Sequence, residues 1–234
     1  MSKGLLALLA LIVSSETALA RRIYDSKDEF RYQGHLSGGK ALEIRGVNGD
    51  VIAEPSSSGE VEVVAWKRSS SGRHSEIKVT VREDSRGTTV AALYPEPSDA
   101  EVKFLVRVPA GVRFIGRTSN GRVAASGIRG EVEAHTINGD IDVKSESGVR
   151  ASTINGSITA QGSRAQLETV NGSVTLTLPF NRGLELDARI VHGAFTTDIP
   201  FTQIGHDHWH GVVGRGGPIY DVKTVNGDIH LERH

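Results

Sequence analysis

The densest cluster of residues with metal-binding chemistry is the run HDHWH at residues 206–210. On a strand, alternate side chains share one face, so His206, His208 and His210 would point the same way. Imidazoles grouped in this manner are ligands for Zn²⁺ or Cu²⁺. An irregular loop is the alternative interpretation. We therefore treat these residues and His192 only as candidate ligands, and the sequence predicts no cofactor.

Carboxylates are the second source of chemistry. Glu131, Glu133, Asp140 and Asp142 form two closely spaced acidic pairs, and polysaccharide hydrolases work with two carboxylates. Charged residues on an outward strand face are usually solvated surface that discourages aggregation. The chain has no Gly-x-Ser-x-Gly elbow, phosphate loop or His-Glu-x-x-His motif. We expect a protein that is not an enzyme, with a polysaccharide lyase or hydrolase as the alternative.

The elements that must position these residues are copies of one repeat. The segment TINGDI at residues 136–141 recurs, with small changes, along the chain, and from Asn120 to Asn171 its Asn moves on by 16 to 18 residues per copy. Such self-similarity indicates a repeat architecture. The predicted repeat corners are Asn48, Asn120, Asn138, Asn155, Asn171, His192, His210 and Asn226.

Period-two alternation places a Thr, two residues before each corner Asn except Asn48, on the inward face. Asn-Gly between strands is also the strongest signal for a β-hairpin, so an antiparallel meander is one interpretation. Stacked coils explain better why each column keeps its residue type, because a residue then touches its own copy one coil away. Stacked Asn side chains would also form a hydrogen-bonded ladder. We predict a right-handed parallel β-solenoid with coils of 16–18 residues, preceded by alternating β-strands.

Two His-Gly pairs interrupt the Asn-Gly pattern. His192 and His210 each precede a Gly and stand 18 residues apart, which is close to the length of one coil. We expect them in the same corner column on adjacent coils, about 5 Å apart. The alternative is that the second pair lies in a loop.

Composition and the N-terminal residues indicate an exported protein. The chain has 234 residues and no Cys. Its formal net charge of −1 argues against a nucleic-acid binder, which normally has a basic excess. A cationic residue, a short apolar run and an Ala-Leu-Ala site predict a signal peptide over residues 1–20. We expect a poorly ordered lead-in over 21–40, a β-strand region over 41–111 and the repeat solenoid over 112–234, continuous with that region. No transmembrane segment is expected in the mature chain.

The order of motifs resembles a known family. A weak first Asn-Gly, charged strands, the turn VPAG at 108–111, serial Thr-x-Asn-Gly units and a final TVNGDI follow a secretory signal. This resembles the bacterial "putative adhesin" β-helix family, a group of domains of unknown function. The resemblance covers roughly residues 40–234 and implies an exported, envelope-associated β-solenoid without known catalytic residues. We expect a non-catalytic periplasmic, envelope or secreted scaffold that binds an unknown envelope protein or glycan. A carbohydrate-active enzyme on a β-helix scaffold is the alternative.

Overall fold

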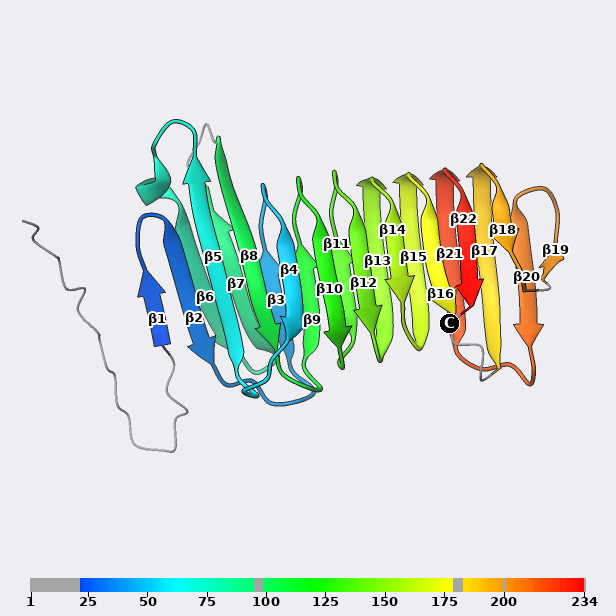
Figure 1. Cartoon of the computed structure of the whole chain (residues 1–234), viewed down its shortest axis with the longest axis horizontal. Helices are drawn as coiled ribbons and strands as arrows, with labels where there is room; N and C mark the ends of the chain where they lie inside the picture. Colours follow the sequence, from blue (N-terminus) through cyan, green and yellow to red (C-terminus); the bar gives the residue numbers. More distant parts are fainter. Residues whose placement is uncertain (1–21, 95–98, 179–182, 200, 234) are drawn as a thin grey trace, which may run out of the picture.

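The structure is a computed structural model that describes residues 22–94, 99–178, 183–199 and 201–233. Over these residues the chain is all-β, with two 11-stranded sheets and one 3₁₀ turn, η1 (His74–Glu76). The sheets lie face to face along an elongated molecule (Figure 1). The expected signal peptide, residues 1–20, lies outside the described residues. No helix in the described part of the chain is long and apolar enough to cross a membrane.

The strands of each sheet can be given in spatial order. Sheet A contains β1 (Arg22–Asp25), β2 (Glu29–Gly34), β5 (Val61–Ser69), β8 (Ala100–Val108), β4 (Val51–Pro55), β10 (Val123–Ile128), β12 (Ile141–Ser145), β14 (Ile158–Gln161), β16 (Val174–Leu178), β22 (Ile229–Arg233) and β18 (Phe195–Thr197). Sheet B contains β19 (Thr202–Gln203), β20 (His208–Val213), β17 (Leu184–His192), β21 (Ile219–Asn226), β15 (Arg164–Asn171), β13 (Gly148–Asn155), β11 (Val132–His135), β9 (Arg113–Arg117), β3 (Ala41–Arg45), β7 (Gly87–Leu93) and β6 (Lys78–Asp84).

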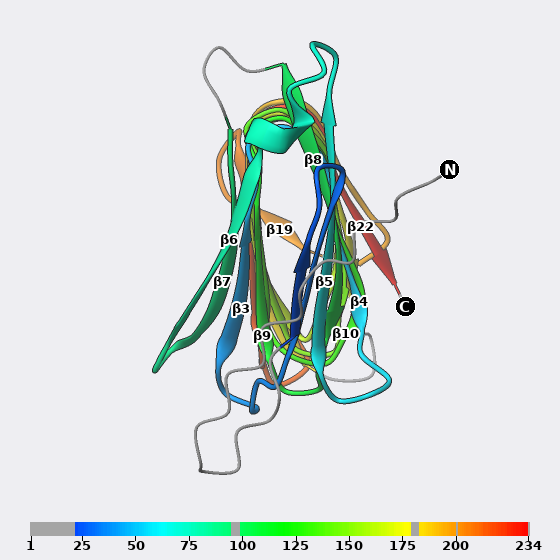
Figure 2. The same cartoon turned by 90° about the vertical axis from the view of Figure 1, so that its left-hand side faces the viewer.

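The repeat forms a stack of rungs, where a rung is one strand of sheet B and the next strand of the chain in sheet A. Neighbouring rungs pair in parallel and in register, so Val123 lies beside Ile141 and Ile141 beside Ile158. Figure 2 looks along this stack and shows the strands superimposed in two layers. The expected all-β chain is confirmed, with two large and mostly parallel sheets.

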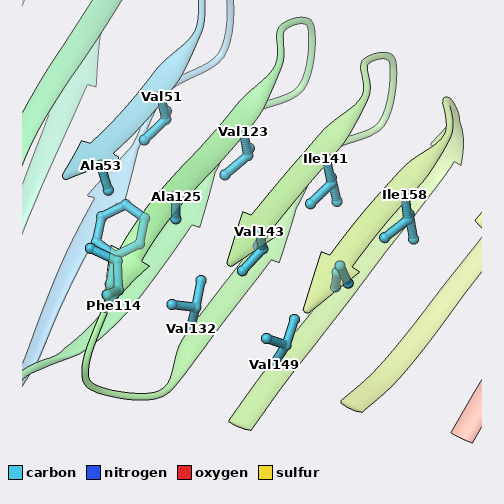
Figure 3. Close-up of a cluster of buried hydrophobic side chains, with 14 of the residues drawn as sticks. Val51, Ala53, Phe114, Val123, Ala125, Val132, Ile141, Val143, Val149 and Ile158 are labelled. Carbon is cyan, nitrogen blue, oxygen red and sulfur yellow. The ribbon is translucent and has the colours of Figure 1, made fainter. Parts of the chain in front are cut away.

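The core fills the narrow space between the two sheets. Along each strand, buried and exposed residues alternate, as in β8, because successive side chains point to opposite faces. Figure 3 shows Val123 and Ile141 of sheet A on one side of this space and Phe114 and Val132 of sheet B on the other. Stacked copies of the same apolar column therefore make one continuous core.

The corner after each sheet B strand is held by a buried Thr and a Gly. Thr153 donates a hydrogen bond from Oγ1 to the carbonyl of Gly139 in the preceding rung, at 3.1 Å. The four other Thr residues of the column, Thr118, Thr136, Thr169 and Thr224, do the same at 2.9 to 3.0 Å. The corner glycines pack so closely that a Cβ on Gly156 would lie 2.0 Å from the oxygen of Gly139. The inward orientation predicted for the Thr column is thus confirmed.

The spatial order of the last rungs differs from their order in the sequence. The C-terminal rung, β21 and β22, lies between the rung of β15 and β16 and the rung of β17 and β18. This position places Asn226 beside Asn171, so the Thr and Asn columns run on without interruption. The strand β20 then covers the far edge of β17 in antiparallel pairing.

The prediction of a poorly ordered lead-in over residues 21–40 was wrong. Residues 29–34 form β2, which pairs antiparallel with β5 and buries Phe30 and Tyr32 over the N-terminal end of the core. Lys67 on β5 is 4% exposed and pairs with the carboxylate of Asp25, the last residue of β1. This ion pair anchors β1 to the sheet. In this segment Phe30 and Tyr32 alternate with polar residues, which is the pattern of a strand with one buried face.

Candidate functional site

Six of the predicted corner residues form one ladder of side-chain amides. Each Asn donates from Nδ2 to Oδ1 of the Asn in the preceding rung, and every one of these distances is 2.8 Å. The order along the stack is Asn48, Asn120, Asn138, Asn155, Asn171 and Asn226. Asn48 begins the ladder and donates to the carbonyl of Ala100, at 3.2 Å. Because the side-chain amides bond to one another, the ladder joins the rungs at the corner, and its role is structural.

The histidines at the corner positions are separated. His192 lies beside Asn226 and continues the column at its far end. His210 lies opposite Asp187 on β17, five residues before His192, which is about 16 Å along a strand. The prediction that His192 and His210 stack on adjacent rungs was therefore wrong, because β20 runs antiparallel and has no corner at His210.

Two of the other candidate metal ligands, His208 and His210, lie at one carboxylate. His208 Nε2 lies 2.7 Å from Asp187 Oδ2, and His210 Nδ1 lies 3.9 Å from the same oxygen. His206 is exposed in the segment before β20. Over the described residues, no group of three or more His, Asp or Glu side chains is arranged to hold a metal ion.

A hollow of about 390 Å³ on the outer face of sheet B is the strongest candidate binding site. It lies over β9, β11, β13, β15 and β21, and its volume is within the range of small-molecule sites. Its polar lining consists of Arg113, Glu131, Glu133, Arg150, Arg164, Gln166 and Asp221. Two of the predicted carboxylates therefore border this hollow. The other two, Asp140 and Asp142, belong to the sheet A side of their rung.

The absence of a side chain at Gly148 shapes the floor of the hollow. Gly148 lies in register with Arg164, whose side chain crosses over it; a Cβ there would lie 2.9 Å from Arg164 Nε. Arg164 thereby reaches Glu131, 33 residues away in the chain, and forms an ion pair with it. The sequence offered a signal for this pair, since column alignment places residues 131, 148 and 164 in one row.

Glu133 is the centre of the ionic network beside the hollow. Its carboxylate pairs with Arg113 and accepts from Arg117 Nη2 at 2.8 Å and from His135 Nε2 at 2.9 Å. Burial alone would raise the pKa of Glu133, but the hydrogen bonds and charges of His135 and Arg113 outweigh it and lower the pKa below its ordinary value. The other ring nitrogen of His135 lies 2.6 Å from Ser152 Oγ. Sequence reasoning missed His135, although period two placed it on the same face as Glu133.

Two side chains that line the hollow lack hydrogen-bond partners for some of their polar atoms. Within the described part of the chain, Arg150 has no ion pair or hydrogen bond from its guanidinium, and its side chain is exposed. Asp221 Oδ1 is buried and has no hydrogen-bond donor, while the other oxygen, Oδ2, pairs with Lys223 Nζ at 2.9 Å. Gln166 lies between Arg150 and Asp221 in the same row of the sheet. The hollow thus presents one free cation, Arg150; the unpaired oxygen of Asp221 lies about two strand spacings away, or roughly 10 Å, and is closed to solvent.

Comparisons with known proteins give structural likeness only. No family model matches the sequence, and no curated protein matches it. The chain is similar to a "putative cell adhesion protein" from Clostridium sporogenes, with a TM-score of 0.48, 10% identity and coverage of 87% of this chain and 99% of that one. It is also similar to a "putative adhesin" from Bacteroides fragilis, with a TM-score of 0.31, 11% identity and coverage of 89% and 98%.

Proposed function

We propose that this chain is an exported envelope or surface protein that binds its ligand in the hollow on the outer face of sheet B. We further infer that its two sheets are the faces of a right-handed parallel β-solenoid, the handedness expected for parallel crossovers. Solenoids offer long, regular surfaces for binding, and this face carries the site. The Ala-Leu-Ala cleavage signal supports export to the periplasm, envelope or medium.

The observation that carries the proposal is the unpaired, exposed guanidinium of Arg150 in the lining of the hollow. An unpaired guanidinium in a hollow with a polar lining suits a carboxylate or another anion, because Arg binds such groups with directed hydrogen bonds. A ligand with an anionic group matches Arg150, which favours an acidic envelope glycan. An envelope protein is the competing ligand.

A polysaccharide-cleaving enzyme is the second candidate, because carboxylates do border the hollow. Glycosidases need one carboxylic acid that stays protonated near neutral pH, which requires a raised pKa. The pKa of Glu133 is lowered instead, and Glu131 is paired with Arg164. The lowered pKa of Glu133 favours its ionised form, which supports binding over proton transfer.

A glycan array and a pull-down from envelope extract test the proposal with matched variants. Arg150→Ala should weaken binding by about tenfold or more, the loss expected for a charge-assisted contact. Arg82→Ala is the control, since Arg82 is an exposed arginine on the edge strand β6. If Arg150→Ala and Arg82→Ala bind the ligand equally well, the hollow is not the binding site. Shortening of a bound polysaccharide over time would instead favour the enzyme.

A further inference from the structure

A line of exposed aliphatic side chains runs along the corner of the stack. Each belongs to the residue immediately before the corner Asn or His, and the side chains are 36% to 58% exposed. We call this line the ridge; it consists of Val47, Ile137, Ile154, Val170, Val225 and Val191. Ser119 occupies the same position in the second rung. From Ile137 to Val191 the ridge covers five consecutive rungs, or about 19 Å.

The ridge follows from the repeat, yet the fold itself does not require it to be apolar. Thr153 points inward, so the next residue, Ile154, must point outward. Ser119 shows that a polar residue is accepted at this position. The neighbouring Asn ladder carries no charge, so the corner is an uncharged strip in a chain with 24% charged residues. An exposed apolar line of this length is typical of an interaction surface.

The two sides of the ridge carry opposite charge. On the sheet B side, two residues before each ridge position, lie Arg45, Arg117, Glu168, Lys223 and Arg189. On the sheet A side, three residues after each ridge position, lie Asp50, Arg122, Asp140 and Asp228. All four cations of this flank pair with carboxylates on the side away from the ridge, namely Glu43, Glu133, Asp221 and Asp187. The ridge therefore has a net basic flank and a net acidic flank.

We propose that the ridge is the interface of a homodimer in which two copies lie side by side and parallel. A second copy presents side chains at the same spacing of about 4.8 Å and in the same order, so that each rung meets the same rung of its partner. A two-fold axis parallel to the ridge places the basic flank of one copy against the acidic flank of the other. An antiparallel arrangement would place like flanks together, which is repulsive. The ridge lies on the corner and not in the hollow, so this inference goes beyond the proposed function.

Sedimentation of the purified chain tests the association. A narrow interface, below ~1,200 Å², is weak, so we expect a concentration-dependent dimer at roughly 100 µM. Ile137→Thr with Ile154→Thr should raise the dissociation constant about tenfold or more, because it removes apolar contact from both copies. Threonine keeps the β-branched shape that suits a strand. Ile52→Thr makes the same change at an exposed position on sheet A and should leave the dimer unchanged.

Cysteine cross-linking tests the parallel arrangement. The chain contains no Cys, so a single introduced thiol reports only on its own position. Ile137→Cys and Val225→Cys should each form a disulfide-linked dimer separately, whereas Ile52→Cys should not. Cross-linking that appears only when the Ile137→Cys and Val225→Cys proteins are mixed would overturn the parallel arrangement. A monomer at all concentrations, or a dimer that is insensitive to the double Thr variant, would overturn the interface itself.

Discussion

The corner glycines set the spacing of the stack, and Gly156→Ala tests this directly. Gly156 does not have a positive φ, so an Ala there would be opposed only by contact with its neighbours. Its Cβ would lie 2.0 Å from the oxygen of Gly139 and 2.5 Å from the carbon, both backbone atoms. Because real Cβ contacts are not shorter than 3.0 Å, the two rungs must separate by about 1 Å at this corner.

The magnitude follows from the hydrogen bonds that cross this gap. Asn155 donates to Asn138 at 2.8 Å, Thr153 donates to Gly139 at 3.1 Å, and the amide of Ser157 donates to Asp140 at 2.8 Å. The amide N–H of Gly139 donates to the carbonyl of the residue before Gly156 at 2.9 Å. A further 1 Å takes all four beyond hydrogen-bonding distance. At 0.5–1.5 kcal/mol each, their loss lowers the free energy of unfolding by about 2–6 kcal/mol.

Urea denaturation followed by circular dichroism measures this loss. The control is Gly38→Ala, since Gly38 also lacks a positive φ and the nearest atom to its added Cβ is 3.8 Å away. We expect the control to remain within about 0.5 kcal/mol of the unchanged protein. If Gly156→Ala is equally harmless, the close approach of the corners does not determine the rung spacing, and the reasoning fails.

Two further predictions concern the end of the ladder and the ionic network. His192→Asn should add one more rung bond, from the new Nδ2 to Asn226 Oδ1, and raise the free energy of unfolding by about 0.5–1 kcal/mol; an unchanged or lower urea midpoint would contradict it. Because the folded-state pKa of Glu133 is lowered, its carboxylate stabilises the fold above the unfolded value near 4.5, and this contribution is lost as pH falls through the folded pKa. Glu133→Gln should lower stability at neutral pH and flatten the acid-side decline in melts between about pH 5 and pH 3; an unchanged pH profile would refute it.

The repeat columns could be predicted from the sequence because each side chain meets its own copy. The alternation around Thr153 and Asn155 was sufficient to place the Thr inside and the Asn in a ladder. The order of the rungs could not be predicted in the same way. The inward column accepts Thr169 of β15, Thr224 of β21 and Ile190 of β17. By residue type alone, β15 could therefore pair in register with either β21 or β17. The bond between Asn226 and Asn171 distinguishes the observed order, and it depends on geometry across 55 residues.

The hollow itself was not predicted from the sequence. The carboxylates Glu131 and Glu133 were recognised as outward residues, but their partners were not. Arg164 reaches Glu131 only because Gly148 leaves a space, and Arg150 is free only because Glu133 is already occupied by Arg113 and Arg117. Such competition among side chains depends on relative positions and not on residue type, which is why a charged strand pattern alone could not show it.

The intercalated C-terminal rung gives the molecule a mechanical asymmetry. A tensile load on the C-terminal end is applied to β22, which is hydrogen-bonded to β16 on one side and to β18 on the other. The strands lie across the long axis of the molecule (Figure 1), so a pull along β22 loads both rows of bonds in shear, all at once. A load on β1 is different, because β1 lies at the edge of the described sheet, where β2 is its only partner among residues 22–233 that the structure places, and it can be peeled away bond by bond. For a pull along the strand direction, β22 therefore resists a larger force than β1.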